Sequence, residues 1–208
     1  MRPLTDHTPK PLLQIGKQRL IEYHLTNLAS AGFTDIVINI AWLGKQIRET
    51  LGDGSHYGVT IAYSDEADSA LETGGGIYKA LPLLGEQPFL VVNGDIWTDY
   101  PLQNLLHHTP AGLAHLVLVN NPPQHPQGDF YLAANKLVAS GSHKLTFSGI
   151  GVYEKTFFAA KTGGAFPLAP MIREFTQRGL VSAELYLGEW DDIGTVERLQ
   201  ARIKKQAP

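Results

Sequence analysis

Cysteine is absent from the 208-residue sequence, which excludes a disulfide framework and a zinc site built from thiolates. An excess of basic residues is also missing, because 17 lysines and arginines stand against 20 acidic residues and leave a net charge of −3. This balance argues against a nucleic-acid-binding surface. No apolar run approaches the roughly 20 residues that span a bilayer, and the N-terminus has no signal-peptide core. We therefore expect a cytoplasmic protein that binds neither nucleic acid nor membrane.

The apolar residues alternate between strand-like and helix-like patterns. Up to residue 95 this alternation is typical of a parallel α/β sheet, whereas later segments indicate antiparallel strands. The expected strands cover residues 35–42, 59–65, 88–95, 113–120, 129–134, 136–140, 145–154 and 181–188. The expected helices cover residues 19–31, 45–52, 77–84, 168–177 and the segment from residue 195 onward. The sequence predicts one α/β domain over residues 1–208 with an antiparallel insertion.

Two aspartates far apart in the sequence each follow a predicted strand. Asp95 ends the run PFLVVNGD, at the carboxyl end of a strand, where open α/β sheets bind ligands. Asp192 stands in WDDIGT, just before the last helix. Each can equally be an ordinary turn or cap residue. Together, however, they could share one Mg²⁺ ion, which proteins hold by one or two carboxylates plus substrate phosphates.

A run of three glycines, residues 74–76, precedes a predicted helix and follows Glu72 and Thr73. Such a run allows backbone N–H groups to approach a nucleobase or a phosphate closely. Taken alone, it favours a flexible turn between strand and helix, because glycine runs are weak signals.

Four stretches, taken together and in order, resemble the sugar-1-phosphate nucleotidyltransferases: PLTDHTPKPLLQIGKQRLIEYHL, LETGGGI, VNGD and WDDIGT. The resemblance runs essentially from end to end of the chain. It implies a Rossmann-like mixed sheet flanked by helices with a small antiparallel insertion. It also implies an enzyme in which a sugar 1-phosphate attacks the α-phosphorus of a nucleoside triphosphate and releases pyrophosphate.

The resemblance also implies roles for individual residues. Lys10 matches a family lysine that contacts the substrate phosphates. Asp95 and Asp192 match the two family aspartates that bind Mg²⁺. Residues near the base and ribose are implied to be Glu72, Gly74 and Gly75. Residues of the sugar pocket are implied to be Asn93, Gly128, Asp129, Ser148 and Gly149.

The resemblance implies UTP and N-acetylmuramate 1-phosphate as substrates, in peptidoglycan recycling, and a monomer. GTP with mannose 1-phosphate, or dTTP with glucose 1-phosphate, fits the same scaffold. An alternative of another class is a non-catalytic module that binds nucleotide or nucleotide sugar. Lys10, Asp95 and Asp192 favour the enzyme, because a sensor has little need of all three.

Met1 matches the residue directly after the family's catalytic arginine. The resemblance therefore implies that the first strand, the glycine-rich phosphate loop and that arginine precede Met1, and we interpret Met1 as an internal methionine. We expect the intact mass of the protein from its native source to exceed 22.8 kDa. The excess should equal the mass of about a dozen residues, which is the length of a short strand and a tight loop. A native mass of 22.8 kDa would contradict this interpretation and favour the binding module.

Overall fold

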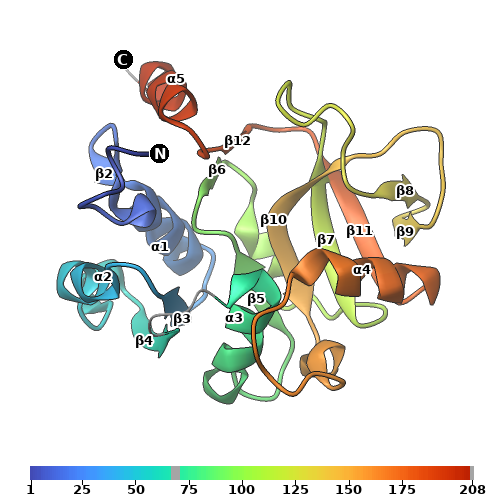
Figure 1. Cartoon of the computed structure of the whole chain (residues 1–208). Helices are drawn as coiled ribbons and strands as arrows, with labels where there is room; N and C mark the ends of the chain where they lie inside the picture. Colours follow the sequence, from blue (N-terminus) through green and yellow to red (C-terminus); the bar gives the residue numbers. More distant parts are fainter. Residues whose placement is uncertain (67–70, 207–208) are drawn as a thin grey trace. The chain divides into compact units, whose positions relative to one another are not determined.

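In the computed structural model, which describes residues 1–66 and 71–206, the chain folds into two compact units (Figure 1). The first unit comprises residues 1–66, 93–106 and 189–206. The second unit comprises residues 71–92 and 107–188. The C-terminal segment therefore belongs with the N-terminal third of the chain.

The described residues of the first unit form three two-stranded sheets, of which two are antiparallel and one is parallel. β1 (Gln14–Ile15) and β2 (Gln18–Arg19) are antiparallel, as are β6 (Ile96–Thr98) and β12 (Trp190–Asp192), whereas β3 (Asp35–Ile40) and β4 (Thr60–Asp65) are parallel. The helices and 3₁₀ turns are η1 (Lys10–Leu12), α1 (Leu20–Ser30), α2 (Gly44–Leu51), η2 (Ser55–Tyr57), η4 (Leu102–Leu105) and α5 (Val196–Gln206).

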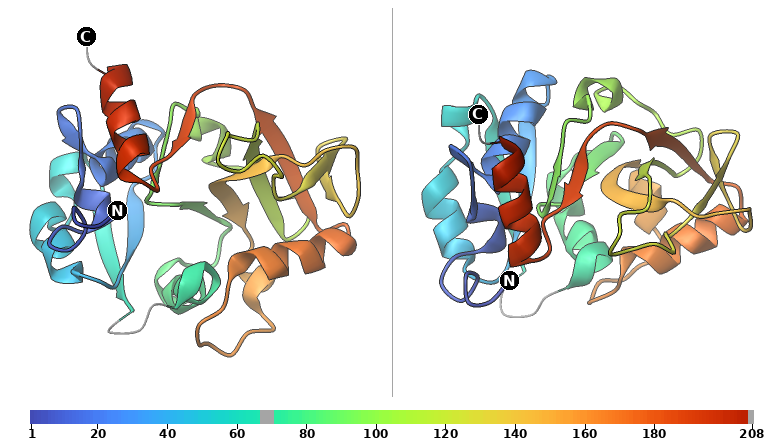
Figure 2. Two further views of the ribbon diagram at one scale, coloured as in Figure 1. Left: turned by 45° about the horizontal axis from the view of Figure 1, so that its top comes forward. Right: turned by 90° about the horizontal axis from the view of Figure 1, so that it is seen from above.

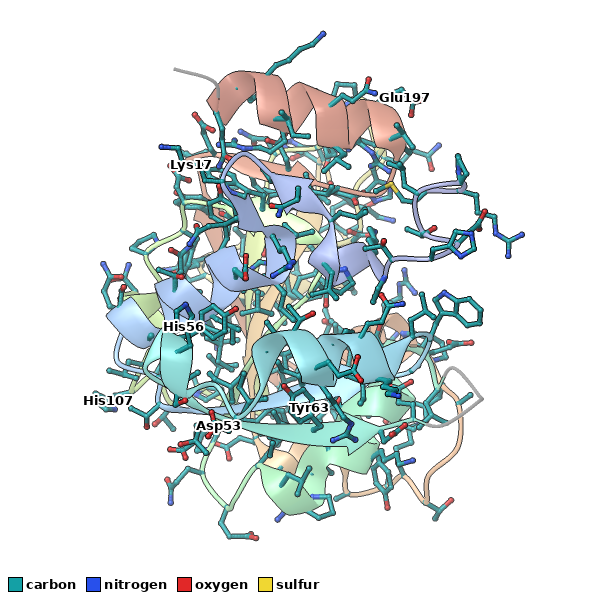
Figure 3. All side chains as sticks on the ribbon, turned by 90° about the vertical axis from the view of Figure 1, so that its left-hand side faces the viewer. Lys17, Asp53, His56, Tyr63, His107 and Glu197 are labelled. Atoms are coloured by element: carbon teal, nitrogen blue, oxygen red, sulfur yellow. The ribbon has the colours of Figure 1, made fainter. Side chains whose placement is uncertain are left out.

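Two hydrophobic clusters hold the first unit together. One cluster joins α1 and α2 to the β3–β4 pair through Leu25, Ile40 and Ile47, among others. The other joins α5 to the N-terminal strands through Ile15, Leu20 and Leu199. Figure 2 shows α5 lying beside the N-terminal segment, and Figure 3 labels Lys17 between β1 and β2 and Glu197 in the first turn of α5. Apolar burial thus fixes the last helix to the start of the chain.

The second unit is built on one mixed sheet with the strand order β5-β10-β7-β11-β9-β8. β7 and β11 are parallel, and the other neighbours are antiparallel. The strands are β5 (Phe89–Val92), β7 (Ala114–Val119), β8 (Tyr131–Ala133), β9 (Lys136–Val138), β10 (Thr146–Tyr153) and β11 (Val181–Tyr186). The helices and 3₁₀ turns are α3 (Glu72–Ala80), η3 (Leu81–Leu83), η5 (Lys155–Phe158) and α4 (Leu168–Gln177). α3 and α4 pack on the same side of this sheet and contribute to its aromatic-rich core (Figure 2).

Most expected elements are present, and the predicted mixed α/β fold with short antiparallel strands is confirmed. The helix over 168–177 has the expected bounds, and those expected at 19–31, at 45–52 and from residue 195 differ by about one residue at each predicted boundary. The expectation that the strands before residue 95 form one parallel sheet is wrong. β3 and β4 pair with each other, while β5 pairs antiparallel with β10. The long apolar strand β10, which follows much later in the sequence, provides β5 with its hydrogen-bonding partner.

The expected glycine turn before a helix at 77–84 is also wrong. Helix α3 begins at Glu72 and contains the glycines, which are buried. A Cβ atom on Gly75 would overlap with the backbone oxygen of Gly164, and one on Gly74 would lie 2.6 Å from the Phe166 ring. Close packing against the 164–166 segment therefore outweighs the low helix propensity of glycine.

No helix among the described residues has both the length and the apolar character needed to cross a membrane.

We expect Gly75→Ala to destabilise the protein by about 1–3 kcal/mol, because the added methyl group meets backbone rather than a side chain that can move aside. Helix propensity alone predicts the opposite sign, a stabilisation of about 1 kcal/mol. Thermal unfolding followed by circular dichroism measures the change. The matched control is Thr73→Ala, which alters an exposed residue of the same helix. An unfolding midpoint of Gly75→Ala at or above that of the unaltered protein would contradict the packing argument.

Candidate active site

The lysine of the N-terminal loop lies against one of the two predicted carboxylates. Pro9 and Pro11 flank Lys10, and the short 3₁₀ turn η1 begins at this lysine. Lys10 Nζ donates a hydrogen bond to Asp95 Oδ2 at 2.7 Å, with both side chains partly exposed. The flanking prolines restrict the backbone on both sides of the lysine, which limits the positions that its ammonium group can reach.

The β6–β12 pair brings the two predicted metal ligands close together: Asp95 directly precedes β6, and Asp192 ends β12. Asp192, the last residue of β12, is opposite Ile96 in the register. The Ile193 N–H donates to the backbone oxygen of Asp95 at 2.8 Å, one step further along the same ladder. Two aspartates from distant parts of the sequence thereby become structural neighbours.

The second carboxylate also has a cationic partner. Arg198, in the first turn of α5, donates from Nη1 to Asp192 Oδ2 at 2.6 Å. The backbone N–H of Arg198 donates to Thr195 Oγ1 at 3.3 Å, in the manner of a helix N-cap. Each predicted metal ligand therefore carries its own compensating cation in this structure.

A second arginine of α5 secures the strand that carries Asp192. The guanidinium of Arg202 is buried and pairs with Glu189 at 2.7 Å and Asp191 at 3.2 Å. It also lies over the Trp97 ring of β6, 3.1 Å from the ring centroid. A buried charge is tolerated only when it is paired, and here the pairing holds α5, β12 and β6 together.

A buried histidine of α1 lies behind the loop of Asp95. Burial lowers the pKa of His24 to about 4, against the opposing effects of a hydrogen bond with the Ile96 backbone and of the Asp95 charge. Its Nε2 atom has no hydrogen-bond partner among the described residues. His24 is therefore neutral at physiological pH and contacts the backbone at the start of β6, next to Asp95.

The donor set of this region fits a hard divalent cation. Among residues 1–66 and 71–206, no group of three or more His, Cys, Asp or Glu side chains forms a metal cage. Two neighbouring carboxylates without such a cage suit Mg²⁺, which takes one or two carboxylates and completes its shell with water and phosphate. Lys10 and Arg198 must share or give up these carboxylates when a metal binds.

Asn93 and Gly94 directly precede Asp95 in the sequence. Asn93 is half-buried, and its backbone oxygen accepts a 3.5 Å hydrogen bond from Ile96 N–H. Gly94 does not have a positive φ. A Cβ atom there would only touch Pro11, at 3.9 Å, so this position has no steric need for glycine.

The predicted nucleotide-binding residues belong to the second unit. Glu72 is exposed at the start of α3 and has a φ of 58°, an uncommon conformation for a residue with a side chain. Gly74 and Gly75 are buried within the helix, and the Gly75 N–H donates to the Phe166 backbone oxygen at 3.1 Å. The glycines thus pack against a neighbouring segment, while Glu72 remains accessible.

The structure also brings together the predicted sugar-pocket residues of the second unit. Asp129 accepts a hydrogen bond from Phe147 N–H at 2.9 Å, which joins the 128–129 turn to an irregularity in β10. Gly128 and Gly149 have positive φ angles of 59° and 85°. Ser148 is buried and donates to the Val117 backbone oxygen at 2.7 Å. The Ser148 hydroxyl is therefore already engaged within the sheet.

Sequence reasoning missed Arg198 and His24. A signal for Arg198 was present, because basic residues recur at helical spacing after the acidic run that ends at Asp192 (Arg198, Arg202 and Lys205). For His24 no comparable signal exists, since its environment comes from the distant segment around Ile96.

Comparisons with known proteins agree with this arrangement. A family model described as Nucleotidyl transferase matches residues 1–132. The chain is 51% identical over 209 residues to the N-acetylmuramate alpha-1-phosphate uridylyltransferase of Neisseria meningitidis serogroup B, covering 96% of this chain and 90% of the relative. It is 30% identical over 230 residues to the protein of the same name from Caulobacter vibrioides, covering 100% of this chain and 90% of that one.

A solved structure supports the fold independently. The chain superposes with a TM-score of 0.86 on a Bacillus anthracis protein solved with sucrose and assigned as a glucose-1-phosphate thymidylyltransferase. The match covers 99% of this chain and 89% of that structure, at 20% identity. At this identity the similarity concerns the fold alone, and it confirms the predicted α/β architecture.

The neutral state of His24 makes stability depend on pH. The unfolded chain protonates this histidine near its ordinary pKa of 6.5, whereas the folded chain does so only near pH 4. The corresponding stability is present above pH 6.5 and is lost as the pH falls toward 4. We expect His24→Gln to reduce the difference in unfolding free energy between pH 7.5 and pH 5 by about 2 kcal/mol, as measured by urea unfolding.

The matched control is His56→Gln, which changes an exposed histidine of the same unit (Figure 3). We expect this control to keep the pH dependence of the unaltered protein. Equal pH dependence in the two variants would refute the role of His24.

Proposed function

Because the chain belongs to the nucleotidyl transferase family, we propose that it transfers UMP from UTP to N-acetylmuramate α-1-phosphate and releases pyrophosphate. The relative from Neisseria meningitidis, 51% identical over nearly the whole chain, supports this choice of base and sugar. The broader assignment as a sugar-1-phosphate nucleotidyltransferase does not depend on that choice.

One observation carries the chemical part of the proposal: Lys10 Nζ lies 2.7 Å from Asp95 Oδ2, and the Asp95 backbone oxygen accepts a hydrogen bond from Ile193, the residue after Asp192. A lysine ammonium group is a point charge that binds phosphate oxygens well. The two carboxylates provide the oxygen ligands that Mg²⁺ prefers. A site for a triphosphate needs both elements within a few ångströms of each other.

The proposed reaction joins two phosphate groups. An oxygen of the sugar 1-phosphate attacks the α-phosphorus of UTP, a new P–O bond forms, and the bond to the bridging oxygen breaks as pyrophosphate leaves with the electron pair. Catalysis of this kind rests on positioning and on charge neutralisation. When bound, Mg²⁺ supplies Lewis-acid neutralisation of the phosphate oxygens. Asp95 and Asp192 hold it, and Lys10 turns from Asp95 to donate hydrogen bonds to those oxygens.

The roles of the nucleotide-binding and sugar-binding residues are also part of the proposal. We assign Glu72, Gly74 and Gly75 to the base and ribose. The accessible position of Glu72 and its strained backbone support its role, since strain of this kind concentrates at functional sites. For the sugar we retain a set of five residues: Asn93, Gly128, Asp129, Ser148 and Gly149. The buried hydroxyl of Ser148 leaves it the role of shaping the β10 irregularity rather than of contacting sugar directly.

The test is an assay of the chain with Mg²⁺, UTP and N-acetylmuramate α-1-phosphate, in which pyrophosphate release and the nucleotide sugar are both measured. We expect Asp95→Asn and Asp192→Asn each to lower turnover about 100-fold or more, because metal neutralisation of the phosphates contributes several kcal/mol. The matched control is Asp35→Asn, an exposed aspartate of the same unit that bonds only to its neighbour Thr34 among the hydrogen bonds described.

Each outcome separates the candidates. Unchanged turnover in either site variant would refute the metal assignment. Binding of UTP without pyrophosphate release, together with tolerance of Asp95→Asn, would support the non-catalytic module instead. Faster turnover of GTP with mannose 1-phosphate, or of dTTP with glucose 1-phosphate, would retain the reaction and replace the substrates.

A further inference from the structure

The pair between Arg198 and Asp192 is built into the local chain rather than formed by chance at the surface. Its Nη1···Oδ2 distance is 2.6 Å, and the two side chains are only 28% and 36% exposed. The helix N-cap at Thr195 fixes the backbone of Arg198 and so the base of its side chain. Short charge-assisted hydrogen bonds of this kind are stronger than ordinary surface ion pairs.

A glycine leaves the space that this pair needs. Gly194 does not have a positive φ, so its backbone conformation is open to other residues. A Cβ atom at this position, however, would overlap with Arg198 Nη2 and would lie 2.9 Å from Asp192 Oδ1. The volume that a side chain at Gly194 would fill is thus occupied by the guanidinium and the carboxylate. The need for glycine at position 194 is therefore explained by the Arg198 side chain, which occupies this space.

The same contact conflicts with a metal at Asp192. Mg²⁺ binds carboxylate oxygens at about 2.1 Å, so a metal on this carboxylate stands within a few ångströms of the guanidinium. Two cations at such a distance repel each other strongly in a partly buried setting. The Asp192 carboxylate cannot bind both Mg²⁺ and the Arg198 guanidinium at full strength, so one of the two cations must move away.

We propose that Arg198 is a built-in competitor for the metal: its guanidinium holds Asp192 in the metal-free protein, and a divalent cation has to displace it. Arg198 thereby limits the occupancy of the site at low metal concentration and keeps Asp192 in place until the metal arrives. This inference rests on the proposed function, because it requires Asp192 to be a metal ligand.

The experiment measures the binding of Mn²⁺, a hard divalent cation visible by electron paramagnetic resonance, to the whole chain without substrates. We expect Arg198→Met to tighten Mn²⁺ binding about threefold to tenfold, the factor that corresponds to removing one competing ion pair of this kind. Arg198→Gln keeps a hydrogen-bond donor without the charge, and we expect its affinity to lie between those of Arg198→Met and the unaltered protein.

The matched control is Lys204→Met, which removes the same charge from the same helix at an exposed residue that contacts no acidic group in the described part of the chain. We expect its affinity to stay within about twofold of the unaltered protein, because exposed charges are well screened. Thermal unfolding of each variant without metal reports whether the fold is intact. Arg198→Met is expected to be less stable without Mn²⁺ and to gain more from Mn²⁺.

Two results would overturn the inference, and they are distinguishable. Mn²⁺ affinity of both Arg198 variants equal to or weaker than that of the unaltered protein would show that Arg198 positions Asp192 rather than competing for it. Asp192→Asn separates this from a failure of the proposed function. If this variant binds Mn²⁺ as the unaltered protein does, Asp192 is not a ligand and both proposals fail.

Discussion

The candidate site depends on one backbone pairing, the antiparallel ladder between β6 and β12. Through it the C-terminal segment returns to the loop of Asp95, and the hydrogen bond from Ile193 N–H to the Asp95 backbone oxygen closes the contact. A ladder of three residues on each strand is weak by itself. It is held by α5, which packs onto the N-terminal strands through a shared apolar cluster. Burial of α5 therefore determines whether the two aspartates can act together.

Charge compensation follows from this arrangement. Bringing acidic residues together at the β6–β12 pair raises their mutual repulsion, and partial removal from water raises the cost further. Cations from different elements pair with these acidic residues and compensate their charge. They are Lys10 from the N-terminal loop and Arg198 and Arg202 from α5. Arg202 is buried and pairs with Glu189 and Asp191, whereas Lys10 and Arg198 pair with Asp95 and Asp192, two partly exposed carboxylates that a ligand can reach. The first kind of cation stabilises the fold, and the second kind prepares the site for exchange with other ions.

The sequence predicted four of the five helices within about one residue at each predicted boundary, most strands, and the proximity of Asp95 and Asp192, because these depend on local periodicity and on recognisable motifs. It failed where distant contacts decide the outcome. β5 joins β10 rather than β3 and β4, since a strand's neighbour is chosen by tertiary packing. The buried state of His24 likewise comes from a segment about seventy residues away along the chain. The roles of the second unit's residues stay predictions, because a substrate contact is not encoded in local periodicity.

Two glycines in these motifs are explained by the space around them rather than by their backbone conformation. Neither Gly75 nor Gly194 has a positive φ, yet each stands where another group occupies the place of a Cβ atom. At Gly75 that group is backbone, which cannot move aside without disturbing α3. At Gly194 it is the far end of a long arginine side chain, which can. The first glycine therefore serves the fold. The second leaves room for the ion pair between Arg198 and Asp192. The arginine side chain can move away, as the proposed exchange of cations at Asp192 requires.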